Sequence, residues 1–208
     1  MSAQGPIAGL VASAGEELDP YAERILEAAR EELAAYGLRR TTLDDIAARA
    51  GVGRATLYRR FAGRDRLLAE LVAREARRLI AYVDAQMRVH DTPSERLVAA
   101  FLAFISQLRG HKLLRRVVVS DPDEILPILT NPATLALGRD YIAAQAAREQ
   151  AEGAELTADP SVIGELLARF AHSLALTPDS VLPLDDEEAL TALARATLVP
   201  LVFAGGDT

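Results

Sequence analysis

The residues with the clearest chemistry lie in one short segment, RATLYRRFAGR, from Arg54 to Arg64. It brings together guanidinium groups, a hydroxyl and a phenol, which are the groups that bind phosphate oxygens and base edges of duplex DNA. From Arg39 to Arg66 there are eight arginines against three acidic residues, although the chain of 208 residues has a net charge of −7. A basic head on an acidic body suits a protein that presents one end to nucleic acid.

Two short helical patterns joined by a tight turn must position these groups. Thr41 or Thr42 can cap the first helix, and Asp44 or Asp45 follows three residues later as in a capping box. Gly51 stands where a helix end needs a positive φ. The pattern predicts a helix-turn-helix, in which the second helix enters the major groove of DNA. The alternative is a solvated helical hairpin, which the local charge disfavours.

The faces of the second helix follow from a rotation of about 100° per residue. Toward the first helix this rotation places Gly53, Leu57 and Phe61. Outward it places Ala55, Thr56, Tyr58 and Arg59. The outward face therefore carries polar groups and no apolar stripe.

The order and spacing of these residues resemble the tetracycline-repressor (TetR) family over about 50 residues. The similarity is carried by Thr42 to Ala47, Ala50-Gly51-Val52, Thr56-Leu57-Tyr58, Phe61 and Arg64 to Leu67. Gly53 and Arg64 depart from the usual Ser/Thr and Lys. Glycine is an acceptable N-cap and arginine keeps the charge, but the missing Ser/Thr hydroxyl removes one expected phosphate contact. The resemblance implies an all-helical homodimer in which a ligand-binding body follows the DNA-binding head.

On DNA we expect one set of residues to hold phosphates, namely Thr42, Thr56, Tyr58 and Arg64. Arg54 and Arg59 are the candidates for base edges, because a guanidinium can bind guanine in bidentate fashion. Ala55 is placed to touch a thymine methyl. Four further arginines are either phosphate contacts or solvated charge, and the sequence leaves both open: Arg39, Arg40, Arg49 and Arg60.

The chain as a whole is predicted to be all-α. We expect a flexible tail over 1–18, a three-helix DNA-binding domain over 19–66, and an effector-binding and dimerisation domain over 67–208. Five helix starts are marked by a capping residue followed by proline: Asp19-Pro20, Thr92-Pro93, Asp121-Pro122, Asn131-Pro132 and Asp159-Pro160. Helices are expected at 63–88, 93–109, 111–120, 122–130, 132–152, 160–176 and 185–203. The helix at 63–88 would link the two domains.

The last two long helices carry broad apolar faces, which core packing alone could explain. The resemblance implies that they also pair with their copies in a two-fold, four-helix interface. The expected interface residues are Val162, Leu166, Phe170, Leu190, Leu193, Thr197 and Leu201. Asp185 with Glu188 reads as a capping box at the start of the final helix.

The resemblance also implies a small effector bound inside the body. The lining expected from it is Phe101, Phe104, Ile105, Leu108, Val117, Leu126, Tyr141, Gln145 and Phe170. An apolar wall favours a hydrophobic or amphipathic ligand. Three nearby arginines would matter for an anionic ligand, with surface placement as the alternative: Arg109, Arg115 and Arg116.

No enzyme constellation or cofactor site is evident, so the protein is not expected to be an enzyme. There are no cysteines, which excludes disulfides and thiol chemistry. His90, His111 and His172 lack metal-ligand spacing, and a satisfied core or interface role is expected for His172. No run of eighteen apolar residues and no secretory signal is present, so we expect a cytoplasmic protein without membrane contact.

The sequence therefore predicts a homodimeric transcriptional repressor that binds a palindromic operator and is released by a small ligand. An activator or an effector-independent regulator is the first alternative. A helical ligand carrier or enzyme that retains the head is the second.

Overall fold

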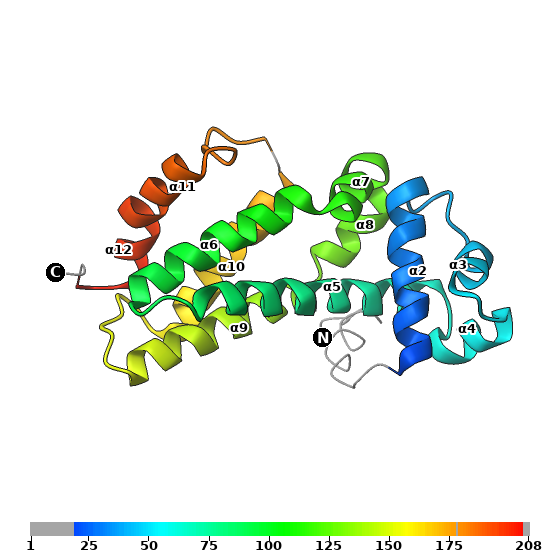
Figure 1. The fold of residues 1–208 in the computed structure, drawn as a ribbon, viewed down its shortest axis with the longest axis horizontal. Coiled ribbons are helices and arrows are strands. Elements are labelled where there is room, and N and C mark those ends of the chain that lie inside the picture. Colours follow the sequence, from blue (N-terminus) through cyan, green and yellow to red (C-terminus); the bar gives the residue numbers. More distant parts are fainter. Residues whose placement is uncertain (1–18, 178, 206–208) are drawn as a thin grey trace, which may run out of the picture. The chain divides into compact units, whose positions relative to one another are not determined.

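The computed structural model describes residues 19–177 and 179–205, and the tail expected over 1–18 lies outside them. Over this range the chain is helical, and its only β feature is an isolated bridge between Leu156 and Phe203. The helices are α2 (Pro20–Tyr36), α3 (Leu43–Ala50), α4 (Arg54–Phe61), α5 (Arg64–Met87), α6 (Pro93–Gly110), α7 (Lys112–Ser120), α8 (Pro122–Leu129), α9 (Pro132–Ala151), α10 (Pro160–Leu176), α11 (Glu187–Leu193), η1 (Ala194–Leu198) and α12 (Val199–Val202). The predicted all-α class is confirmed (Figure 1).

The chain divides into two compact units. The first contains α2 to α4, α5 as far as Ala76, and α7 with α8. The second contains α5 from Arg77, α6, α9 from Leu135, and the helices that follow as far as α12. This division does not coincide with the boundary expected at residue 66, because α7 and α8 bury apolar side chains in the same core as α2. Those side chains are Leu113, Val117, Ile125 and Ile128, each 8% exposed or less. No single helix of the described residues is long and apolar enough to cross a membrane. Only the bent pair α6 and α7, counted together, has the length and composition of a membrane-spanning segment.

At four of the five helix starts predicted from a capping residue followed by proline, the capping side chain accepts a hydrogen bond from the first turn of the helix. Asp19 accepts from the backbone N–H groups of residues 21 and 22 at 2.9 and 3.1 Å. Thr92, Asn131 and Asp159 accept from N–H groups two or three residues ahead. Asp121 is the exception, because its carboxylate does not cap α8 and instead accepts from the Leu38 N–H at 3.0 Å. The Asp-Pro sequence that marks a capped helix start at Asp19 therefore supplies a tertiary contact at Asp121.

The final helix differs from the prediction. It begins at Glu187, with Asp186 as N-cap accepting from the Ala189 N–H at 3.0 Å, so the expected Asp185–Glu188 capping box is wrong. Asp185 instead forms an ion pair with Arg109. The helix widens into a π turn at η1, just before Pro200. A proline lacks an N–H and crowds the carbonyl four residues back, which accounts for the break.

In the first unit, α3 packs on α2 and α4, and α7 packs on α2 (Figure 1). Arg74 of α5 is only 3% exposed and pairs with Glu23 and Glu27 of α2 and with Glu75. Burial acts to raise the pKa of Glu75, but hydrogen bonds from His111 and Arg74 outweigh it, and the pKa lies below its ordinary value. This buried network joins α2, α5 and the start of α7, which carries His111 as its N-cap.

The second unit is held by apolar packing and by ion pairs, among them one between α6 and α9. Arg96 of α6 donates to both carboxylate oxygens of Glu149 on α9, at 2.8 and 2.5 Å. The rings of Phe101 and Phe170 stack with centroids 6.1 Å apart. At Gly164 a Cβ would lie 2.6 Å from the Arg139 carbonyl, so glycine allows α9 and α10 to approach closely.

Candidate nucleic-acid interface

The turn between α3 and α4 is built by caps at both ends of α3. Thr42 accepts from the Asp45 N–H at 3.2 Å, and the Asp45 carboxylate accepts from the Thr42 N–H at 2.9 Å. Of the two pairs that the sequence allowed, Thr42 with Asp45 therefore forms the capping box. Gly51 ends α3 in the left-handed region at φ 62°, as predicted. The Val52 N–H then donates to the Ala47 carbonyl at 3.0 Å and closes the corner.

Recognition helix α4 is anchored by two apolar side chains. Leu57 and Phe61 are 0% and 2% exposed and pack in the core of the first unit, as predicted. Gly53, which was expected on the same inward side, is exposed, and a Cβ there would meet nothing within 4 Å. The reason is that Gly53 is the N-cap with extended backbone, φ −70° and ψ 147°, so the helical rotation does not apply to it.

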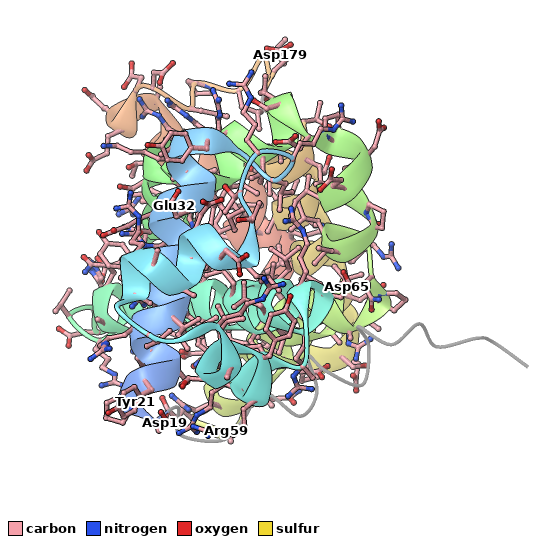
Figure 2. The ribbon with its side chains drawn as sticks, turned by 90° about the vertical axis from the view of Figure 1, so that its right-hand side faces the viewer. Asp19, Tyr21, Glu32, Arg59, Asp65 and Asp179 are labelled. Atoms are coloured by element: carbon pink, nitrogen blue, oxygen red, sulfur yellow. The ribbon has the colours of Figure 1, made fainter. Side chains whose placement is uncertain are left out.

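Three of the four residues predicted to face outward from α4 are exposed. Ala55, Tyr58 and Arg59 are exposed, and Thr56 is half-buried. No partner of Arg59 is shown among the described residues, and Figure 2 labels Arg59 at the lower edge of the view, near Asp19 and away from Glu32. An exposed guanidinium without an internal partner keeps all its N–H donors for a ligand.

Arg54, at the first position of α4, is held by two neighbours. Its Nη1 donates to the Asp44 carboxylate of α3 at 2.9 Å, and its Cζ lies 5.4 Å from the centroid of the Tyr58 ring. The pKa of Arg54 is above its ordinary value, mainly through hydrogen bonding to Tyr58 and then through the charge of Asp44. Asp44 and Tyr58 thus fix the orientation of the Arg54 guanidinium, whereas no such contact is shown for Arg59.

Three of the four arginines whose role was open form ion pairs within the first unit. Arg49 bonds to Glu32 at 2.5 Å, Arg60 pairs with Asp19, and Arg39 lies 3.4 Å from Asp123 and close to two further acids. Arg40 is exposed without a partner among the described residues. A phosphate contact is therefore simplest for Arg40, since the other three would first have to leave a carboxylate.

Arg64 is engaged internally. Its guanidinium donates to the Thr41 carbonyl at 2.6 Å and to the Leu38 carbonyl, and it lies 3.6 Å from Glu124. A phosphate contact through Arg64 requires a change of rotamer. The hydroxyl of Thr42 also donates to Asp45, at 2.6 Å. Both phosphate assignments stay predictions.

Sequence reasoning missed Arg24 and Asp44. The Arg24 guanidinium of α2 donates to the carbonyls of Ala50 and Gly51 at 3.1 and 3.4 Å, which supplies donors to the carboxyl end of α3. Asp44 holds Arg54, ten residues ahead. Neither spacing is helical, so only the tertiary arrangement reveals these contacts.

The residues expected to line an effector cavity separate into two groups. In the second unit, Phe101 and Ile105 are buried core residues, 8% and 1% exposed, and Phe104, Leu108 and Phe170 pack against them. Tyr141 donates to the Met87 sulfur at 3.7 Å, and Gln145 donates to Asp84 at 3.4 Å. Burial, followed by the charge of Asp84, raises the pKa of Tyr141 to about 12. The remaining two residues belong to the first unit, where Val117 is 3% exposed in the core and Leu126 is 37% exposed.

A groove of about 790 Å³ lies in the second unit. Its walls come from the end of α5, from α6 and from α11, with Val98, Leu102 and Leu190 among its apolar residues. Of the predicted lining only Ile105 contributes to it. Arg109 also borders the groove, where it bonds to the Leu184 carbonyl at 2.8 Å, whereas Arg115 and Arg116 are exposed residues of the first unit.

The expected dimer residues are mostly accessible in the single chain. Val162, Leu166 and Leu201 are 47%, 50% and 46% exposed, which is unusual for large apolar side chains. Thr197 is exposed as well, and Leu193 and Phe170 are half-buried. Leu190 is 3% exposed and packs in the core of its own chain, so it has no surface to offer a partner.

His172 departs from its expected role, because its Nε2 is buried without a hydrogen-bond partner. Among the described residues no three His, Asp or Glu side chains gather as metal ligands.

Together, an exposed polar face on a second helix, a glycine turn and a basic flank define a helix-turn-helix DNA-binding protein. The sequence model described as bacterial regulatory proteins, tetR family, matches residues 25–71. An HTH-type transcriptional regulator from Mycobacterium bovis is 29% identical over 174 residues, which cover 83% of this chain and 90% of the relative. Residues 25–71 are therefore similar to the DNA-binding segment of the tetR family, and most of the chain is similar to HTH-type transcriptional regulators.

Solved structures agree on the fold. The TetR family repressor AlkX from Dietzia sp. superposes with a TM-score of 0.67 at 17% identity, covering 90% of this chain and 97% of that one. A TetR-family transcriptional regulator from Pectobacterium atrosepticum gives 0.66 at 19% identity, covering 92% and 100%. At these identities the likeness concerns the fold, and the roles of individual residues rest on the geometry above.

Proposed function

We propose that this protein is a homodimeric repressor that binds a palindromic operator and is released by a small hydrophobic or amphipathic ligand. The observation that carries DNA binding is the outward face of α4, where Tyr58 and Arg59 are exposed on a helix anchored by Leu57 and Phe61. An anchored helix with a polar outer face can enter the major groove without losing its own packing. Repression is supported by the description of the structural relative AlkX as a repressor.

Dimerisation is supported by two independent arguments. One short recognition helix contacts few base pairs, and a second copy about 34–36 Å away doubles the contacts on successive major grooves. Exposed Val162, Leu166 and Leu201 supply apolar surface on α10 and α12 that a partner copy would cover. A two-fold dimer in turn requires a palindromic operator.

For the ligand we propose the groove between α5, α6 and α11. Its volume of about 790 Å³ suits a small organic molecule, and apolar side chains are flanked there by polar ones such as Glu95 and Arg195. Release would need the ligand to favour a conformation that misfits the operator. To reverse occupancy from 99:1 to 1:99, the ligand must prefer that conformation by about 5.5 kcal/mol.

The test of operator binding is selection from random duplex DNA, followed by affinity measurements on the selected and a scrambled sequence. The proposal expects a palindromic motif and a preference of at least about a thousandfold over scrambled DNA at physiological salt. Equal affinity for both sequences would show that the protein is not a sequence-specific regulator. A reporter carrying the selected motif within a promoter then distinguishes repression from activation.

The ligand is tested by a screen of hydrophobic and amphipathic compounds for thermal stabilisation, followed by operator titration with each hit. Ala99→Trp should fill the groove and abolish stabilisation, whereas Ala144→Trp, at an exposed site on α9, should not. Operator affinity that stays unchanged at saturating ligand would identify an effector-independent regulator. Stabilisation that survives Ala99→Trp would place the ligand elsewhere.

A further inference from the structure

We propose that Asp44 is a positioning residue for sequence readout, because it holds Arg54 in an orientation suited to a base edge. The inference rests on the operator binding proposed above and deepens it. It concerns a side chain on the first helix of the motif, which helps the second helix to discriminate between bases.

The geometry directs Arg54 from two sides. Asp44 Oδ2 lies 2.9 Å from Arg54 Nη1 and belongs to α3, whereas Tyr58 belongs to the next turn of α4 and places its ring 5.4 Å from Arg54 Cζ. The side chains of Arg54 and Asp44 are 65% and 58% exposed, so the pair lies at the surface. One contact limits the direction of the guanidinium and the other limits the tilt of its plane.

The held guanidinium still has hydrogen-bonding capacity. Arg54 has five N–H donors, of which one on Nη1 bonds to Asp44 and another is engaged by the hydrogen bond with Tyr58. The remaining donors can reach guanine O6 and N7, the commonest specific contact in the major groove. Holding the Arg54 side chain before binding lowers the conformational entropy lost on binding. The resulting gain in affinity applies only to DNA that places an acceptor where the held guanidinium can reach it.

The charge of Asp44 adds a second selective effect. A carboxylate beside Arg54 repels phosphate oxygens, so it disfavours a backbone contact by Arg54. Arg59 lies on the same helix and has no such partner among the described residues. We therefore infer that Arg54 reads a base more strictly than Arg59 does.

Asp44 is not needed for the local fold in the way that its neighbour is. The capping box of α3 is made by Thr42 and Asp45, and Arg54 is the only partner shown for the Asp44 side chain among the described residues. The alternative role is a favourable charge in the first turn of α3. The two roles differ in what they do to base preference.

The experiment compares base preference at every operator position for wild type, Asp44→Asn, Arg54→Ala and the double variant. Asp65→Asn is the matched control, because Asp65 is another exposed carboxylate in a first turn of the same unit and does not contact Arg54. Both Asn variants should bind scrambled DNA more tightly, since each removes one negative charge.

Only Asp44→Asn should flatten the preference, and at the same position that Arg54→Ala flattens. The loss should be up to about fivefold, the ratio for an exposed ion pair of at most ~1 kcal/mol. Asp44→Glu should retain most of the preference, and the double variant should match Arg54→Ala. Thermal melts confirm that each variant is folded.

Two results overturn the inference without touching the proposed function. In one, Asp44→Asn gives the same preference profile as Asp65→Asn while wild type selects a clear motif. In the other, Arg54→Ala leaves the profile unchanged. If wild type selects no motif, the proposed function fails and this inference fails with it.

Discussion

The carboxylate of Asp121 accepts a hydrogen bond from the backbone N–H of Leu38 at 3.0 Å, across 83 positions of sequence. Asp121 is 4% exposed and lies at the corner between α7 and α8, whereas Leu38 lies in the loop between α2 and α3. Arg39 adds an ion pair at 3.7 Å. The loop that leads into the helix-turn-helix is therefore fixed by a residue from a distant part of the chain.

Replacing Asp121 should destabilise the first unit. Asp121→Ala leaves the Leu38 N–H buried without an acceptor and removes a charge-assisted bond, which together cost about 1–3 kcal/mol. Urea unfolding followed by far-UV circular dichroism measures the change. Asp123→Ala is the matched control, because the Asp123 side chain is 86% exposed, and its effect should stay within about 0.5 kcal/mol. Equal effects for the two variants would contradict the structural role.

Gly37 is constrained by the same carboxylate. A Cβ at Gly37 would lie 2.6 Å from Asp121 Oδ2, and the backbone there has φ 81°, which disfavours any side chain. Gly37→Ala should therefore cost about 1–3 kcal/mol. In an Asp121→Ala background, Gly37→Ala should lose the share of its destabilisation that comes from the clash with the Asp121 carboxylate. The share that comes from the positive φ should remain. A double-mutant cycle measures this coupling, and strict additivity would show that no clash exists.

Local signals in the sequence were sufficient for most of the fold. Asp19 before a proline, the Thr42–Asp45 box and Gly51 act within a few residues, so they can be read from spacing alone. The inward positions Leu57 and Phe61 follow from helical rotation in the same way. These features place the recognition helix and its outer face before any tertiary information is used.

The contacts that sequence reasoning missed are tertiary. Asp121 has the same Asp-Pro signature as Asp19, yet its carboxylate serves Leu38, because the chain returns there from another helix. Arg64 looked available for phosphate, whereas the loop carbonyls around it take its donors. Leu190 shares an apolar face with Leu201, but only packing decides that the first is buried and the second is exposed.

Arg59 should contribute to sequence recognition. Arg59→Ala should weaken specific binding by about 1–3 kcal/mol and relax base preference at one position, because the side chain is exposed on α4 without an internal partner. Affinities for the selected operator and for single-base variants measure both effects. Arg60→Ala serves as control, since Arg60 is paired with Asp19. A uniform loss on all DNA would assign Arg59 to a phosphate.

The capping box of α3 should be sensitive to acid. Hydrogen bonds from the Thr42 hydroxyl and then from its backbone N–H lower the pKa of Asp45 below its ordinary value of 3.8. A carboxylate whose pKa is lower in the folded state stabilises that state fully above the ordinary value, and the effect is lost as pH falls through the lower one. The difference in Tm between wild type and Asp45→Asn should thus be constant above about pH 5.

Below pH 3.8 the same difference should shrink, because protonated Asp45 resembles asparagine. Using the difference removes the contribution of other carboxylates that titrate in the same range. A difference that stays constant down to pH 2 would show that Asp45 has no coupling to folding.

The exposed apolar side chains of α10 and α12 should form the dimer contact. Leu166→Glu places a charge on a residue that is 50% exposed in the single chain and would be covered in the dimer. Burying an unpaired carboxylate costs several kcal/mol, so the dimer should weaken by about a hundredfold or more. Sedimentation equilibrium measures the association. Val181→Glu, at a fully exposed position before α11, should leave it unchanged. In the proposed dimer the two heads bind one operator together, so Leu166→Glu should also reduce affinity for the full palindrome toward that for a half-site. A variant that still dimerises as wild type does would move the interface away from α10.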